Sequence, residues 1–164
     1  QLGECAFAAW MGVPYRWEYK QGGDNGDFDF PCRTNEKDGV IKIDVKTAGR
    51  DYGSCLIYKT SPGGVEQPLK CHAYVCAVVR SDDRDEKKAT VELLGFVTRT
   101  DVKENAVVEQ THKHVNGSQG RWMNYRVDHD TLRPMEELRE RLTAVGWSIN
   151  DGGVGDQTCG EEGS

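Results

Sequence analysis

The chain lacks any long apolar run, and no stretch approaches the roughly 18 to 20 apolar residues that a membrane-spanning helix needs. It also lacks a basic excess: the net charge is −6, which counts against a strongly basic nucleic-acid-binding protein. The first residues, QLGECAFAAWMGV, contain no basic leader, so we expect an amphipathic helix there rather than a signal peptide. These absences favour a soluble globular protein.

No C-x-x-C pair occurs among the six cysteines, so the sequence indicates no local zinc or iron–sulfur site. In a chain of this length without a secretory signal, we expect free, buried cysteines and a reducing compartment. Cys71 and Cys76 lie five residues apart on an expected strand. Odd spacing points two side chains to opposite faces of a strand, so we do not expect this pair to share a metal.

Helices are expected at both ends of one domain, because 164 residues suffice for a single substantial core. Apolar residues at helical spacing predict a first helix that ends near Gly12 and Pro14. A last helix is expected from Pro134 to Val145, with Pro134 near its start and Gly146 just past its end. The segment 98–110 is expected to hold a short helix and a polar connection.

Strand patterns fill the middle of the chain. DFDFPCRT and VIKIDVKT alternate on either side of NEKDG, which predicts a β-hairpin. HAYVCAVV predicts a buried central strand, VELLGFVT the next strand and RWMNYRV an edge strand. The expected fold class is therefore α/β, a single domain over 1–149 with a mixed β-sheet flanked by helices. The Gly-rich, acidic residues 150–164 are expected to form a flexible tail.

The hairpin gathers the side chains that carry chemistry. In VIKIDVKT, alternation places three apolar side chains on one face and three charged ones on the other: Ile41, Ile43 and Val45, against Lys42, Asp44 and Lys46. In DFDF it places two aromatic side chains on one face and two acidic ones on the other: Phe28 and Phe30, against Asp27 and Asp29. A turn near residue 37 would bring Asp29 almost opposite Asp44.

Carboxylates about 4 Å apart repel by roughly 1 to 4 kcal/mol at surface-like dielectric, so such a pair favours a compensating cation. Mg²⁺ suits it, because this ion takes hard oxygen ligands and binds through one or two carboxylates, completed by waters and phosphates. Lys46 would lie beside this pair, where an ammonium group can orient a water nucleophile and offset developing negative charge.

These residues resemble the PD-(D/E)xK nuclease superfamily, which has the restriction-endonuclease-like fold. The match is Asp29-Phe30, followed fifteen positions later by Asp44-Val45-Lys46, with Gly3-Glu4 in the preceding helix. The apolar strand Tyr74–Val79 and the later Leu94-Gly95-Phe96 fit the same order. The resemblance implies that Asp29, Asp44 and the Val45 carbonyl bind metal, that Lys46 positions water, and that Glu4 reaches the site.

Three departures from the pattern leave alternatives open. Phe28 stands where the family has proline, Asp27 and Asp24 compete with Asp29 as the metal ligand, and Glu18 competes with Glu4. The resemblance implies a phosphodiester hydrolase acting on DNA with Mg²⁺, for which Mn²⁺ would substitute. We further expect a homodimer and a cytoplasmic location in a microbe or a virus-infected cell. RNA is another substrate that this resemblance allows. The alternative is a non-catalytic nucleic-acid-binding or assembly module that retains the fold.

A second polar cluster follows in an expected loop: His112, Lys113, His114, Arg121, Trp122 and Arg126. One interpretation is a contact with the DNA backbone that includes one stacking aromatic residue. The other is a solvated loop whose tryptophan packs on the core.

Overall fold

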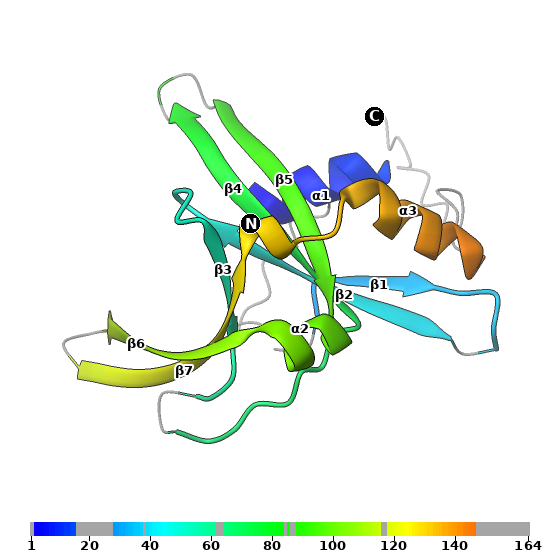
Figure 1. Ribbon diagram of the computed structural model, residues 1–164. Helices are drawn as coiled ribbons and strands as arrows, with labels where there is room; N and C mark the ends of the chain where they lie inside the picture. Colours follow the sequence, from blue (N-terminus) through cyan, green and yellow to red (C-terminus); the bar gives the residue numbers. More distant parts are fainter. Residues whose placement is uncertain are drawn as a thin grey trace, which may run out of the picture.

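Seven strands, three α-helices and one 3₁₀ turn form in the part of the chain that the computed structural model describes (Figure 1). That part comprises residues 2–15, 28–37, 39–61, 64–83, 85, 88–115 and 118–146, without the side chains of 111–122. The elements are α1 (Leu2–Met11), β1 (Phe30–Arg33), β2 (Val40–Ala48), β3 (Ser54–Tyr58), β4 (Ala73–Asp83), β5 (Lys88–Thr98), α2 (Arg99–Asn105), β6 (Val107–Val115), β7 (Ser118–Asp128), η1 (His129–Thr131) and α3 (Met135–Ala144).

The first sheet has the order β1-β2-β4-β5 and is mixed, because β2 and β4 are parallel while the other two pairs are antiparallel. The predicted hairpin is confirmed, with Phe30 opposite Ile43. The predicted central strand is confirmed as well, since β4 is buried from Ala73 to Val78. Strand β4 lies between β2 and β5, and each of its two faces packs against a hydrophobic core. Its residues are therefore apolar on both faces.

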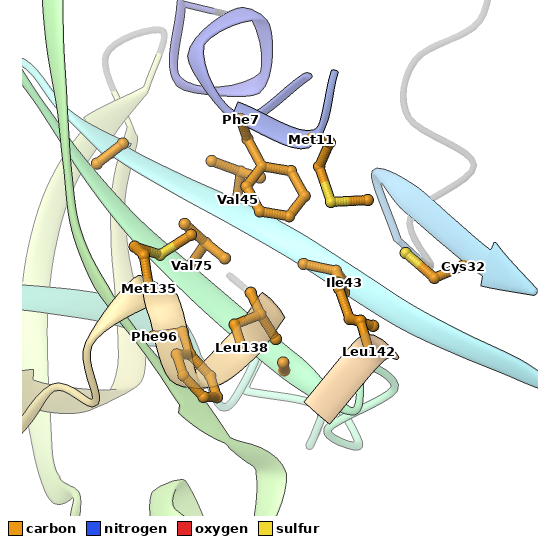
Figure 2. Packing of buried hydrophobic residues seen from close by; sticks show 12 residues of the cluster. Phe7, Met11, Cys32, Ile43, Val45, Val75, Phe96, Met135, Leu138 and Leu142 are labelled. Atoms are coloured by element: carbon orange, nitrogen blue, oxygen red, sulfur yellow. The ribbon is translucent and has the colours of Figure 1, made fainter. Parts of the chain in front are cut away.

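Helices α1 and α3 cover one face of this sheet and enclose the larger core with it (Figure 2). Alternation along β2 sends Ile43 and Val45 into this core, where Phe7 of α1 and Leu142 of α3 also lie. Phe7 stacks on Trp10 and meets Phe30 edge-on at 4.9 Å between ring centroids. Burial of these apolar side chains, worth about 1.5 to 3 kcal/mol each, holds α1 against β2.

The other face of the first sheet packs against a second sheet of order β3-β7-β6 and against α2 (Figure 1). This second sheet corrects three expectations, of which the first is a single mixed sheet, because the described chain forms two sheets. RWMNYRV forms part of the central strand β7 rather than an edge strand, and residues 107–115 form strand β6 rather than a polar connection or loop. Strand β3 was not predicted from the sequence.

The helix ends follow local chemistry. At the start of α2, the Thr98 side chain accepts from the Asp101 N–H, and the Asp101 carboxylate accepts from the Thr98 N–H. This reciprocal capping box satisfies two amide donors that the helix leaves open. The predicted last helix is confirmed, with Pro134 as its first flanking residue and Gly146 just past its end at φ 85°. A positive φ costs glycine little, so the chain can turn away there.

The pairing of Phe28 with Phe30 on one face is wrong. Phe30 packs in the first core and Phe28 in the second, because β1 begins only at Phe30, and Phe28 and Asp29 are not part of a regular strand. The described chain is thus one mixed α/β domain with two sheets. The expected flexible tail, residues 150–164, lies outside the described residues.

Two smaller expectations concern cysteines and membranes. The five described cysteines are free, and all but Cys5 are buried, as expected. Cys71 precedes β4 instead of lying on the same strand as Cys76. Within the described residues, no helix is long and apolar enough to cross a membrane.

Candidate active site

Strand β2 presents Asp44 and Lys46 on the face that looks toward the second sheet. Their neighbours Ile43 and Val45 are buried in the core under the helices, and alternation therefore turns the charged pair away from it. Asp44 and Lys46 line a cavity together with Ile57 and Tyr58 of β3. The predicted separation of chemistry from core along this strand is confirmed.

Asp29 lies beside Asp44 and Lys46 because it immediately precedes β1, which begins at Phe30. The Asp29 N–H donates to the Ile43 carbonyl at 3.0 Å, which continues the ladder between β1 and β2. The Asp29 carboxylate then accepts from the Val45 N–H at 2.7 Å, in place of a backbone acceptor. The carbonyl of Val45 lies on the same edge of the strand as its N–H, because both backbone groups of one residue point to one side.

Three carboxyl groups act on one another at this point. Burial raises the pKa of Asp29 to about 7, and the charges of Asp44 and Glu4 and hydrogen bonding with Asp44 contribute. The hydrogen bond from Val45 opposes this shift without cancelling it. Crowded carboxyl groups with a raised pKa mark a place where a proton or a cation is needed.

Lys46 supplies one positive charge. Its Nζ lies 2.7 Å from Asp44 Oδ2, and its side chain is 29% exposed. Burial lowers the pKa of Lys46, but the charge and hydrogen bond of Asp44 outweigh this, so the net shift is upward and the ammonium keeps its proton. The Lys46 ammonium also lies over the ring of Tyr58, 5.7 Å from its centroid.

Glu4, on α1, acts on Asp29 through its negative charge and is not part of the cavity lining. The Tyr15 hydroxyl donates to Glu4 Oε2 at 2.5 Å. Burial and this carboxylate raise the pKa of Tyr15, which therefore remains a hydrogen-bond donor. Gly3 allows the approach, because a Cβ there would collide with the Thr47 hydroxyl and lie 3.1 Å from the Ala77 Cβ.

The rival ligands lie outside the described residues. Asp24 and Asp27, the competitors of Asp29, are among them, as is Glu18, the competitor of Glu4. Of the predicted site residues that the structure describes, it brings together Asp29, Asp44 and Lys46, with the Val45 backbone beside Asp29, while Glu4 acts on Asp29 through its charge.

The cavity beside this cluster has a volume of about 230 Å³. Its charged and polar lining is Asp29, Asp44, Lys46, Gln67 and Lys70. Its aromatic, aliphatic and sulfur lining is Phe28, Ile57, Tyr58, Pro68, Cys71 and Tyr74. Burial raises the pKa of the Cys71 thiol to about 12, so this group is not a thiolate at neutral pH.

The donor set fits a hard divalent cation in part. Two carboxylates in contact, Asp29 and Asp44, match the one or two that Mg²⁺ takes from proteins. Among the residues with described positions, no group of three or more His, Cys, Asp or Glu side chains is arranged to hold a metal. Glu4 therefore acts on Asp29 through charge without completing a three-carboxylate cluster.

Comparison with known proteins adds no relative. No family model, no curated protein and no solved structure matches this chain.

Several residues at the site escaped the sequence analysis. Tyr15 carried no pattern that could have marked it. Tyr58 lies in SCLIY, where apolar residues do not alternate with polar ones, and only the structure shows that Cys55 and Ile57 are buried while Tyr58 is exposed. Gln67 and Lys70 lie in an irregular segment without periodicity, so only the tertiary fold brings them to the cavity.

The second polar cluster occupies strands, which corrects the expected loop. His112 pairs with Arg121 across the β6–β7 hairpin, and Thr111 pairs with Trp122. Figure 1 shows the far end of this hairpin extending beyond β3. Arg126, the member of the cluster whose side chain is described, forms ion pairs with Glu109 and Asp128, at 3.0 and 3.1 Å.

Proposed function

We propose that this protein is a divalent-metal-dependent nuclease that hydrolyses phosphodiester bonds in DNA, with Asp29, Asp44 and Lys46 at the reacting centre. The observation that carries the proposal is the contact of two carboxyl groups beside an ammonium group in one cavity. A structural ion pair needs one carboxylate, whereas the second, partly buried one raises the cost of the arrangement unless a cation arrives.

Asp29 and Asp44 would hold Mg²⁺, with the Val45 carbonyl at the adjoining edge of β2. Bound there, Mg²⁺ would supply Lewis-acid polarisation of the phosphate and activation of the attacking water. Mn²⁺ has the same preference for oxygen ligands and is expected to substitute.

The chain's own residues would position the cation and the attacking water and would stabilise the negative charge on the phosphate. The hydrogen bond from Val45 fixes one oxygen of Asp29 and leaves its other oxygen for a cation. Lys46 stays protonated beside Asp44, where it would orient the water and offset negative charge that grows on the phosphate. Glu4, held by Tyr15, adds negative potential at Asp29 and so favours cation entry.

The test is cleavage of labelled DNA in Mg²⁺, Mn²⁺ and EDTA. The variants are Lys46→Ala and Asp44→Asn, with Lys37→Ala, an exposed lysine in the β1–β2 turn, as the matched control. We expect metal-dependent cleavage, a loss of about 10² to 10³-fold or more in both site variants, and an unchanged control. Cleavage that persists in EDTA or in both site variants would contradict the proposal.

The competing proposal is a non-catalytic nucleic-acid-binding or assembly module. It is favoured by the ion pair between Lys46 and Asp44, which already neutralises one carboxylate. Calorimetric titration with Mg²⁺ separates the two. Binding that Asp44→Asn abolishes supports the nuclease, and its absence in the wild type supports the module.

A further inference from the structure

The cavity beside the candidate site has two chemically different parts. Asp44 and Lys46 are its charged part, and Phe28, Tyr58 and Tyr74 are its aromatic part. A phosphate belongs at the first part and a flat π-system at the second. One nucleotide carries both groups, joined by its sugar.

Tyr58 links the two parts. It ends the edge strand β3, its side chain is 46% exposed, and its ring faces the Lys46 ammonium at 5.7 Å. An exposed ring next to a cation can stack a base while the cation meets the phosphate of the same nucleotide. Stacking of this kind is tolerant of sequence, because every base has a π-face.

The depth of the cavity decides which DNA can use it. Ile57 and Cys71, 2% and 3% exposed, lie at its inner side, and its volume is about 230 Å³. That space suits a single base, and a base paired and stacked inside a duplex cannot enter it. Enzymes that take a base into such a pocket act on single strands or pull the nucleotide out of the helix.

We propose that this cavity takes the base of an unpaired nucleotide, so that the enzyme cuts single-stranded DNA or single-stranded stretches in preference to duplex DNA. The inference rests on the proposed function and names its substrate class. Lys70, which lines the cavity and is exposed, would meet a neighbouring phosphate, and the amide of Gln67 would hydrogen-bond to the edge of the base.

The first test measures binding without cleavage. A single-stranded oligonucleotide carrying 2-aminopurine is titrated with the protein in EDTA, and stacking on Tyr58 is expected to quench its fluorescence. Tyr58→Ala should weaken binding about tenfold and remove the quenching, as expected for the loss of one base–aromatic stack. Tyr58→Phe should retain both, and Tyr52→Ala, 72% exposed and not part of the cavity lining, is the matched control.

The second test compares metal-dependent cleavage of single-stranded, fully duplex and gapped DNA of one sequence. We expect at least a tenfold preference for unpaired sites, reduced by Tyr58→Ala and not by Tyr58→Phe. Equal cleavage of duplex and single strand, or absence of quenching in the wild type, would overturn the inference and leave the proposed nuclease standing. Quenching that depends on Tyr58, without cleavage of any DNA, would support the base pocket and overturn the nuclease.

Discussion

The carboxylate of Asp29 accepts a hydrogen bond from the backbone N–H of Val45 at 2.7 Å. This side chain takes the place of a backbone acceptor, because β1 begins only at Phe30 and Asp29 lies just before it. A functional carboxylate is therefore fixed by the same ladder that builds the sheet. This arrangement places Asp29 next to Asp44. Ionisation of Asp29 therefore destabilises the folded state, as its raised pKa shows.

The first prediction concerns pH and stability in EDTA. The pKa of Asp29 is raised from 3.8 to about 7 in the folded chain. The stabilisation that the protonated carboxyl group gives to the folded state is therefore fully present below about pH 4 and is lost as the pH rises to about 7. Asp29→Asn removes this loss and still accepts from Val45. Between pH 5 and 8, the free energy of unfolding of the wild type should fall by about 1 to 2 kcal/mol more than that of Asp29→Asn, part of the effect being screened by solvent.

Urea unfolding at both pH values, with and without Mg²⁺, measures this difference. A cation that takes the place of the proton should abolish it by stabilising the ionised form. The same pH slope in wild type and variant would mean that Asp29 ionises normally in the folded chain.

The second prediction concerns the close approach of α1 to the sheet. Gly3 is buried, and a methyl group there would collide with the Thr47 side chain and press on Ala77. Gly3→Ala should therefore destabilise the protein by about 1 to 3 kcal/mol and move Glu4 away from Asp29. Gly49→Ala, where an added Cβ meets nothing within 4 Å, is the control, and thermal unfolding is the measurement. Equal stability of the two variants would contradict this packing.

The sequence predicts well those parts of the first sheet that depend on residues close together in the chain. Alternation in β2, the turn at NEKDG and the apolar run of β4 depend on neighbouring residues, and they suffice to bring Asp29 to Asp44. Phe28 was misplaced because strand periodicity was extended beyond the true start of β1.

The second sheet could not be predicted in the same way. Leu56 of β3 pairs with Arg126 of β7, 70 residues further along the chain, and β6 and β7 are rich in polar residues. Such pairing depends on what the fold brings together and leaves little local pattern. Tyr58 and Lys70 reach the cavity only through that tertiary arrangement.

The third prediction concerns the junction between β5, α2 and the segment before α3. Asp101 caps α2 and also binds Arg133 through two hydrogen bonds, of 2.8 and 2.9 Å. These bonds hold the pKa of Asp101 well below its ordinary 3.8, so its stabilising effect is present above about pH 4 and is lost on acidification below it. Asp101→Asn should cost about 1 to 3 kcal/mol at pH 7.

Chemical unfolding at pH 7 and pH 3 checks it, since the difference between wild type and variant should shrink at the lower pH. Asp82→Asn, an exposed aspartate on β4, serves as the control. A constant difference at both pH values would mean that the charge of Asp101 contributes nothing and that only the shape of the side chain matters.

The last prediction uses Cys71 as a reporter of the cavity. Burial, and next the charge of Asp44, raise the pKa of this thiol to about 12, so thiol reagents at pH 8 should modify it at least 100-fold more slowly than an exposed cysteine. Mg²⁺ bound at Asp44 would offset that negative charge, lower the pKa of Cys71 and speed the reaction. Asp44→Asn should abolish this acceleration, with Cys71→Ala identifying the modified site by mass spectrometry. A rate that Mg²⁺ leaves unchanged in the wild type would argue against a cation at Asp44, whatever activity the protein shows.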